Sequence, residues 1–327
     1  LDFSTSLTKN WLSNIGISFL IKRRISYVVS GTFIIIGLSS LFINGLNQGV
    51  DFVGGRSYVV RFEQPVSQEK IQSNLIKVLG NAEVKTFGSD NQLKITTNYK
   101  VDIDSSDIDD EINNILYTDL IEFMPENIAY EDFVVNGDEN KQAGIMSSIK
   151  VGPTIADDIK KNSFYAVFGS LIIVFLYILL RFKNWQFSLG AVSAVFHDVL
   201  VVLGIFSLTY SFMPFNMEIN QAFIAAVLTV IGYSLNDTVV VFDRIREYRN
   251  INTSWELPRI VDGALNSTLS RTLNTSFTTL VVLVSIFIFG GESIRGFMFA
   301  LIVGVLIGTY SSVFVATPVM YDTLKKK

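Results

Sequence analysis

Residues 228–249 read LTVIGYSLNDTVVVFDRIREYR, and this stretch decides how the chain folds. It is an apolar helix long enough to cross a bilayer, yet it carries the pair Asn236-Asp237 and ends in a run of arginines. A carboxylate inside a spanning helix costs about 2.5–3.5 kcal/mol on insertion scales, so it usually faces a bundle interior or a water path. Asp237 is therefore the first candidate functional residue.

The composition indicates a membrane protein with one polar portion. Of the 327 residues, 49% are hydrophobic and 17% are charged, and the mean hydropathy is +0.41. The net charge of −4 is unevenly distributed, because residues 47–162 hold 11 Lys and Arg against 20 Asp and Glu. This acidic portion argues against a nucleic-acid partner, which would need a basic surface. The lack of cysteine excludes disulfides and thiol chemistry.

Hydropathy predicts an all-α six-helix membrane bundle with one inserted domain. The expected spans are residues 25–46, 163–182, 185–213, 219–243, 269–289 and 294–320, each close to or above the ~20 residues that a bilayer core requires. Lys and Arg gather in the connections on one side of these spans. Such asymmetry predicts that both termini are cytoplasmic, that residues 47–162 lie outside, and that residues 163–320 hold the second to sixth spans.

Both ends of the chain carry shorter segments. Residues 321–327 are expected to form a basic cytoplasmic tail. Residues 1–24 fit either an interfacial amphipathic helix or an ordinary linker. The helical spacing there involves Trp11, Leu12, Ile15 and Phe19. The chain begins at Leu1 rather than at a methionine, so we expect it to come from a longer polypeptide.

The acidic insert reads as one small α+β domain. Its predicted elements are a strand at 57–62, a helix at 71–79, a hairpin of 83–87 and 92–96 around the turn 88–91, a helix at 108–117 and a strand at 145–151. This order predicts a ferredoxin-like domain. The insert shows no metal-ligand spacing, no Gly-rich phosphate loop and no nucleophile beside a base, so no cofactor, metal or enzymatic activity is expected. The acidic run 102–111 fits a solvated turn and helix start better than a calcium site.

Several spans carry polar or small residues in regular patterns. The fourth presents one polar face, made of Thr229, Tyr233, Asn236 and Asp237. The fifth presents a stripe at i, i+3, i+4 and i+7, made of Arg271, Asn274, Thr275 and Thr278. The third carries His197-Asp198 roughly 18 Å beyond Trp185, near mid-membrane. The sixth carries small residues that allow close helix packing, namely Gly296, Ala300, Gly304, Gly308, Ser312 and Ala316.

Asp237 and Arg271 are predicted to lie at comparable depth, because one is near the end of the fourth span and the other near the start of the fifth. If their separation alternates, the proton affinity of Asp237 alternates with it. A proton crossing ~100 mV releases ~2.3 kcal/mol, which is comparable to ~1.4 kcal/mol for each pKa unit. Two simpler interpretations stay open: the pair only pins two helices, and His197 is only a satisfied core residue.

Five motifs resemble those of the SecF family of bacterial protein-export membrane proteins. They are VDFVGG at 50–55, VGP at 151–153, FHD at 196–198, GYSLNDTVVVFDRIRE at 232–247 and TLSRTLNTS at 268–276. The motifs occur in the order expected for that family, and the resemblance covers the chain from Lys22 onward. Val53 stands where the family's usual DFTGG has threonine. The segment before Lys22 resembles the join of a fused SecD–SecF chain.

The resemblance implies half of a twelve-span bundle of the resistance-nodulation-division type, completed by SecD, in the bacterial cytoplasmic membrane. It implies an auxiliary subunit that uses the proton motive force to complete preprotein translocation after the ATP-driven SecA step. The implied partners are SecD, the SecYEG channel, the preprotein and a membrane insertase. The family's transport-linked aspartate maps onto Asp237 and its arginine onto Arg271. Asn236, His197 and Asp198 are proton-relay candidates from their positions alone.

Two other functions stay open at this point. One is half of a proton-coupled small-molecule exporter, which is disfavoured because about 116 residues make only one small external domain. The other is a structural assembly subunit whose polar residues only pack. An enzyme is the poorest alternative, because the only histidine lies within a span.

Overall fold

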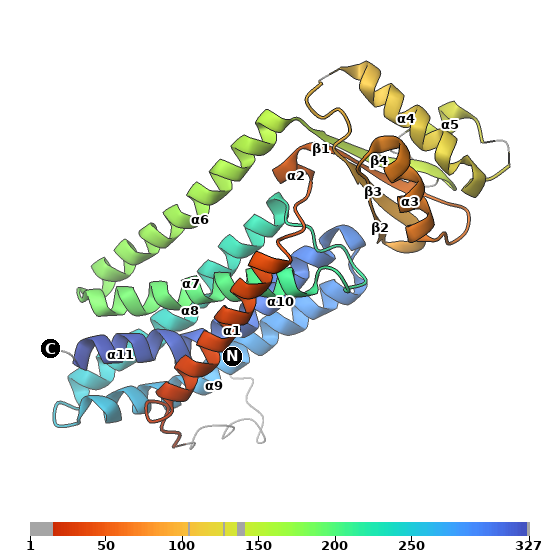
Figure 1. Cartoon of the computed structure of the whole chain (residues 1–327). Helices are drawn as coiled ribbons and strands as arrows, with labels where there is room; N and C mark the ends of the chain where they lie inside the picture. Colours follow the sequence, from red (N-terminus) through yellow and green to blue (C-terminus); the bar gives the residue numbers. More distant parts are fainter. Residues whose placement is uncertain (1–15, 104, 127, 136–140, 326–327) are drawn as a thin grey trace.

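The computed structural model describes residues 16–103, 105–126, 128–135 and 141–325. A helical bundle carries a separate sheet domain at one end, inserted after the first helix of the chain (Figure 1). The described residues include six helices that are long and apolar enough to cross a membrane. We call the end of the bundle beside the sheet domain the proximal end, and the opposite end the distal end.

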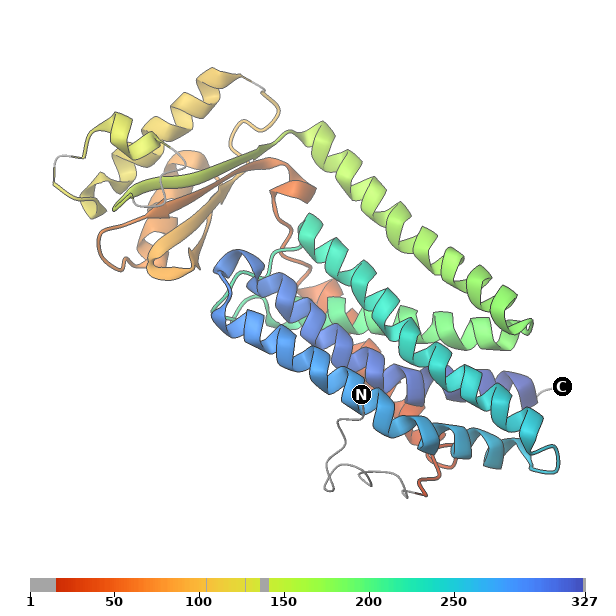
Figure 2. The same cartoon turned by 180° about the vertical axis from the view of Figure 1, so that it is seen from behind.

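The bundle is built from long helices that follow the six predicted apolar stretches. They are α1 (Arg23–Ile43), α6 (Pro153–Phe182), α7 (Trp185–Thr209), α8 (Gln221–Ile251), α9 (Leu257–Phe289), α10 (Glu292–Ser311) and α11 (Thr317–Lys325). Viewed from either side, α6 and α9 lie on opposite sides of the bundle (Figures 1 and 2). The bundle core is continuous and contains buried apolar side chains from α6 to α11, whereas the buried residues of α1 are small.

Two helices extend beyond the predicted spans at the distal end. The predicted spans 219–243 and 269–289 become α8, which continues to Ile251, and α9, which already begins at Leu257. Charged side chains stabilise the added turns of α8, because Arg246 pairs with Asp243 at 3.1 Å across one turn. Hydropathy detects the apolar part of a helix and misses a solvated continuation of this kind.

Most of the segment for which an amphipathic helix or a linker is predicted lies outside the described residues, so both interpretations stay predictions. Trp11, Leu12 and Ile15 are among the residues that the structure does not describe, and residues 16–22 form an irregular stretch followed by a turn. Asn266 on α9 satisfies this backbone, because it accepts from Ile17 N at 3.1 Å and donates to Ile17 O at 2.8 Å. Side-chain hydrogen bonds from a distant helix thus replace the helical ladder there.

The last predicted span is interrupted by a π-helical turn. Residues Ser312–Ala316 form the π segment between α10 and α11, and Thr317 Oγ1 donates to Ser312 O at 2.9 Å. Single π-helical turns inside α-helices are frequently found at functional sites. The sequence shows a regular small-residue ribbon through this region and contains no signal for the interruption.

Small residues let the helices of the bundle approach closely. A Cβ on Gly308 would lie 3.1 Å from Ser234 Cβ, and one on Gly304 would overlap Val230, so α10 packs directly on α8. A Cβ on Gly204 would lie 2.6 Å from Gly37 Cα, which brings α1 against α7 in the same way. The predicted ribbon therefore serves helix packing.

The sheet domain spans residues 50–151. Its elements are α2 (Val50–Val53), β1 (Gly55–Arg61), α3 (Gln68–Leu79), β2 (Glu83–Phe87), β3 (Ser89–Thr97), α4 (Ser106–Leu120), η1 (Ile121–Phe123), α5 (Tyr130–Val134) and β4 (Gly144–Val151). The four strands form one antiparallel sheet in the order β2-β3-β1-β4. The core lies between one face of the sheet and helices α3 and α4, and it is separate from the bundle core.

The predicted four-residue turn of the hairpin is shorter in the structure. Strand β3 begins at Ser89, which pairs with Phe87, so Gly88 alone makes the turn. Gly88 has φ +85°, a conformation that residues with a side chain rarely adopt. The glycine therefore turns the chain within a single residue.

The paired glycines before β1 have a structural reason. Gly54 and Gly55 have φ +73° and +131°, and a Cβ on Gly55 would lie 2.6 Å from Thr97 O. Only glycine fits where the backbone enters the sheet at such close range. The VDFVGG motif thus directs the chain from α1 into the sheet domain.

Acidic residues of the run 102–111 pair with basic residues of the sheet. Arg56 is 3% exposed and donates to Asp109, which also accepts from Lys150 Nζ at 3.0 Å. Burial acts to raise the pKa of Asp109, but the hydrogen bonds from Arg56 and Lys150 outweigh it, so this pKa lies below its ordinary value. Within the described residues, no cluster of His, Cys, Asp or Glu could hold a metal ion.

We predict that Asp109 makes the sheet domain sensitive to acid. A lowered pKa adds stability that is present above the ordinary value of 3.8 and is lost as the pH falls through the lowered value. Asp109→Asn should therefore lower the thermal stability of the full chain at neutral pH and reduce its loss of stability between about pH 5 and pH 3. Asp110→Asn, at an exposed neighbouring acid, is the control. Equal acid profiles for the two variants would contradict the prediction.

Candidate functional site

Asp237 lies on α8 and faces the interior of the bundle. Asp237 is 3% exposed, and no described residue forms a hydrogen bond with its Oδ2 atom. The next residue, Thr238, is fully buried and donates to Ser234 O at 3.0 Å, so it offers the carboxylate no partner. A buried carboxylate without bonded partners carries a high desolvation cost. Its charge must be compensated at longer range, or the group must bind a proton.

Two contacts define how α8 lies along α9. Tyr233 Oη is 3.4 Å from Ser276 Oγ near the middle of the helices, and Arg244 Nε donates to Ser267 Oγ at 3.0 Å nearer the distal end. The residue numbers rise along one helix and fall along the other, so the two helices are antiparallel. Interpolating between these two contacts places Asp237 at the same level as the helical turns of α9 that follow residue 270.

Arg271 is the basic residue at this level. It acts electrostatically on Asp237, yet within the described structure no ion pair of 4.0 Å or less joins them. The Arg271 side chain is exposed, whereas the adjacent Thr272 is buried and its hydroxyl has no hydrogen-bond partner among the described residues. The predicted common depth of Asp237 and Arg271 agrees with the structure, but the two groups do not touch.

The predicted polar face of α8 divides between the interior and the surface. Asp237 points inward, while Thr229 and Asn236 are exposed on the outer side of the bundle. On α9, Arg271, Asn274 and Thr278 are exposed as well. We call these five outward residues the polar stripe. None of the five is buried in this chain.

Asp198 on α7 is the second buried acid, and it is fully hydrogen-bonded. It is 1% exposed, and its Oδ2 accepts from Ser234 Oγ at 2.6 Å and from Ser311 Oγ at 2.7 Å. Its Oδ1 lies 3.0 Å from His197 Nδ1. Three helices thus supply donors to one carboxylate, and Ser311 stands immediately before the π-helical turn.

His197 is oriented by this carboxylate. Because Asp198 Oδ1 accepts, the proton of a neutral ring belongs on Nδ1, and Nε2 is left as an acceptor. Nε2 is buried and has no hydrogen-bond partner among the described residues. The ring lies 6.1 Å from that of Tyr310, whose hydroxyl is 3.0 Å from Ser30 Oγ on α1.

Ser234 connects the surroundings of the two acids. It bonds to Asp198, and Asp237 follows it by three residues on the same helix, or roughly 4.5 Å along the axis. The sequence did not single out Ser234, Ser311 or Tyr310, because isolated Ser and Tyr residues in apolar spans are common and their contacts are long-range. The structure brings Asp198, His197 and α8 together, while Asn236 points away from them.

The acid-bearing helix α8 is held at its proximal end by charged groups. Asp51 Oδ2, in the motif that leads into the sheet domain, accepts from Gln221 N at 3.0 Å, at the first residue of α8. A carboxylate is stabilised at a helix N-terminus. Lys94 on β3 pairs with Glu218, three residues before α8, and their side chains are 14% and 5% exposed. The sheet domain is thereby attached to α8 directly.

Comparison with known proteins identifies the family. Residues 133–326 match the family described as protein export membrane protein SecD/SecF, C-terminal, and residues 39–66 match the SecD/SecF GG motif. The protein translocase subunit SecF of Rhodothermus marinus is 44% identical over 94% of both chains, and that of Haemophilus influenzae is 35% identical over 93% of this chain and 85% of its own. The fold and these matches define a protein-export membrane protein.

A solved structure agrees with this assignment. The crystal structure of SecDF from Thermus thermophilus, a translocon-associated membrane protein, matches 97% of this chain with a TM-score of 0.79 and 28% identity. This chain spans 40% of the length of that SecDF chain. The chain belongs to the SecF family of protein translocase subunits.

We predict that the serine donors to Asp198 contribute strongly to stability. A hydrogen bond to a charged group contributes about 1.5–3 kcal/mol, so Ser234→Ala and Ser311→Ala should each lower the free energy of unfolding by about that amount. Thr238→Val is the matched control, because this buried hydroxyl donates only to a carbonyl of its own helix. Thermal unfolding in detergent at neutral pH measures the effect. Serine variants no less stable than the control would exclude a charged, bonded Asp198.

Proposed function

We propose that this chain is the SecF half of a proton-driven motor that assists preprotein export through the Sec translocon. The observation that carries the proposal is Asp237, which is buried without a bonded partner among the described residues and on which Arg271 acts electrostatically. A purely structural acid would be expected to be paired, as Asp198 is. Asp237 would bind and release a proton as its separation from Arg271 changes. The proposal assigns no enzymatic activity to the chain.

We place both termini in the cytoplasm and the sheet domain on the far side of the membrane. The support is the positive charge at the distal end, where the helix ends and their connections carry Arg181, Lys183, Arg244, Arg246, Arg249 and Arg259. The C-terminal helix α11 also ends at the distal end, away from the sheet domain (Figure 1). For the sheet domain we propose a ferredoxin-like fold, which the alternation of strands and helices and the antiparallel order β2-β3-β1-β4 support.

We assign the polar stripe on α8 and α9 to the interface with SecD. Thr229, Asn236 and Arg271 would be costly against lipid, so a second protein surface should cover them. The likeness to 40% of a SecDF chain supports a second half that completes a twelve-span bundle. SecYEG, the preprotein and a membrane insertase are proposed as further partners of the assembly. His197 is assigned to the same proton path, with Asp198 as the paired acid that orients its ring.

The contacts at the proximal end would transmit the motion of α8 to the sheet domain. Lys94 and Glu218 join β3 to the start of α8, and Asp51 holds the first residue of that helix. A proton-dependent shift of α8 would therefore displace the domain that meets the emerging preprotein. The alternative of a small-molecule exporter is not favoured by any of these contacts.

We predict that Asp237→Asn abolishes export that depends on the proton gradient. An amide keeps the size of the carboxylate but cannot bind the transported proton, so the export rate should fall to that measured with the gradient collapsed. The assay uses membranes that contain the complete translocon with SecD. Asp243→Asn is the control, because this acid lies on the same helix but pairs with Arg181 at 2.9 Å at the distal end. Gradient-driven export at the wild-type rate in Asp237→Asn would leave only the structural role.

We call the ion pair between Lys94 and Glu218 the proximal latch. We predict that reversing one of its two charges uncouples the motion of the sheet domain from that of α8. Lys94→Glu places two carboxylates in a buried contact, and breaking a buried pair costs about 3–5 kcal/mol. Export should fall, and the double variant Lys94→Glu with Glu218→Lys should recover it. Reversal of Lys70, which pairs with Glu122 on the exposed surface of the domain, is the control. If the double variant is expressed normally but does not recover export, the proposed coupling through the ion pair of Lys94 and Glu218 is wrong.

A further inference from the structure

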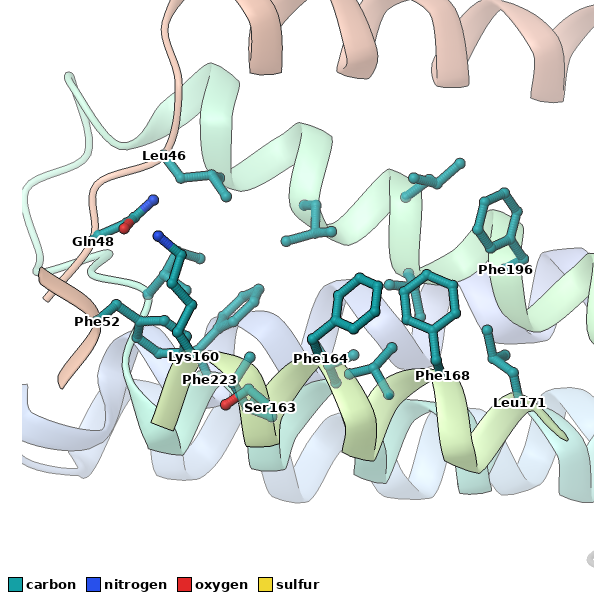
Figure 3. Close-up of a pocket in the computed structure, with 17 residues that line it drawn as sticks. Leu46, Gln48, Phe52, Lys160, Ser163, Phe164, Phe168, Leu171, Phe196 and Phe223 are labelled. Atoms are coloured by element: carbon teal, nitrogen blue, oxygen red, sulfur yellow. The ribbon is translucent and has the colours of Figure 1, made fainter. Parts of the chain in front are cut away.

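An apolar crevice lies between α6 and the rest of the bundle. Its volume is about 340 Å³, within the range of small-molecule sites. Side chains of α6, α7 and α8 form its walls, and Figure 3 shows Phe164 and Phe168 of α6 directed toward α7. Their rings lie 4.2 Å apart and both residues are exposed, so the crevice has an aromatic rim.

The crevice is polar only at its proximal end. Lys160 and the half-buried Gln48 lie there, whereas Leu171 and Phe196 close the other end (Figure 3). Within the described part of the chain, Lys160 has no ion pair of 4.0 Å or less, although Asp157 precedes it by one turn. A lysine near a helix end places its ammonium group at the membrane interface while its alkyl chain covers apolar surface. The site therefore combines an available cation with an apolar channel.

The dimensions of the crevice match one leaflet of a bilayer. Lys160 and Leu171 are eleven residues apart on α6, or roughly 16 Å at 1.5 Å per residue. The hydrocarbon core is about 30 Å thick, so one leaflet is about 15 Å deep. An acyl chain would lie along the aromatic rim with its headgroup at the level of Lys160.

The surroundings of the crevice indicate lipid as its occupant. It lies along α6, which is on the side of the bundle opposite to α9 (Figures 1 and 2). Residues 163–180 of α6 contain no charged side chain, and most of the large ones are exposed and apolar, as expected for a surface in contact with lipid. Apart from Gln48, Lys160 and Ser163 at the proximal end, the lining of the crevice offers a protein partner no polar side chain to bind.

We propose that this crevice binds an anionic phospholipid, with one acyl chain between α6 and α7 and the headgroup phosphate against Lys160 Nζ and the Gln48 amide. Both groups donate hydrogen bonds, and the ammonium charge favours an anionic over a zwitterionic headgroup. The site is independent of the proton path, because none of its lining residues bonds to Asp198 or Asp237.

The test measures lipid bound to the purified full chain. The protein is reconstituted with phosphatidylglycerol or phosphatidylcholine of identical acyl chains, and retained lipid is counted by native mass spectrometry. Lys160→Gln should reduce phosphatidylglycerol occupancy about five-fold, the effect of one lysine near a membrane surface, and should leave phosphatidylcholine unchanged. Lys161→Gln is the matched control, because it removes the neighbouring exposed lysine that does not line the crevice.

A second variant tests the channel itself. Val167→Trp fills the crevice from α6 and should lower the retention of both lipids, whereas Ile172→Trp, on the exposed side of α6, should not. Equal loss of phosphatidylglycerol in Lys160→Gln and Lys161→Gln would overturn the proposal. A photo-crosslinker at Val167 that captures exported polypeptide in place of lipid would overturn it as well.

Discussion

The structure depends on the cost of holding a carboxylate within apolar helices. The chain meets this cost in two ways. Asp198 is bonded by two serine hydroxyls from neighbouring helices and by the histidine that precedes it on α7, and it becomes a fixed part of the core. Asp237 receives none of these within the described residues and has only a distant guanidinium, that of Arg271, to balance it. The contrast separates a structural acid from one whose charge can change, although Ser234, which bonds to Asp198, lies only three residues before Asp237 on α8.

The position of α8 makes this difference consequential. The helix packs closely on α10 through glycines, so a local change at Asp237 is not absorbed by loose packing. Its proximal end is bonded to the GG motif and to strand β3 of the sheet domain. α8 carries one acid whose protonation can change and is bonded to the sheet domain at its proximal end. Such a helix transmits small shifts over a long distance, because packed interfaces switch between discrete arrangements and do not deform continuously.

The sequence predicted most of the framework and part of the site. Periodicity and hydropathy located the six spans and the strands of the sheet domain, because both signals depend on neighbouring residues. The common depth of Asp237 and Arg271 followed from counting along the helices. The donors Ser234 and Ser311, the latch of Lys94 and Glu218, and the π-helical turn could not be predicted, because each arises from contacts between residues far apart in the chain.

The backbone bridge between the end of α1 and the approach to α8 has a consequence for the order of folding. Gly49 N donates to Ile219 O at 2.9 Å, and Ile219 N donates to Asn47 O at 2.7 Å, across some 170 residues of chain. The core of the sheet domain is complete by Ile145, long before Ile219 is synthesised. Since domains fold as units and the N-terminal part folds first, the domain would assemble untethered and be secured only when the fourth span arrives.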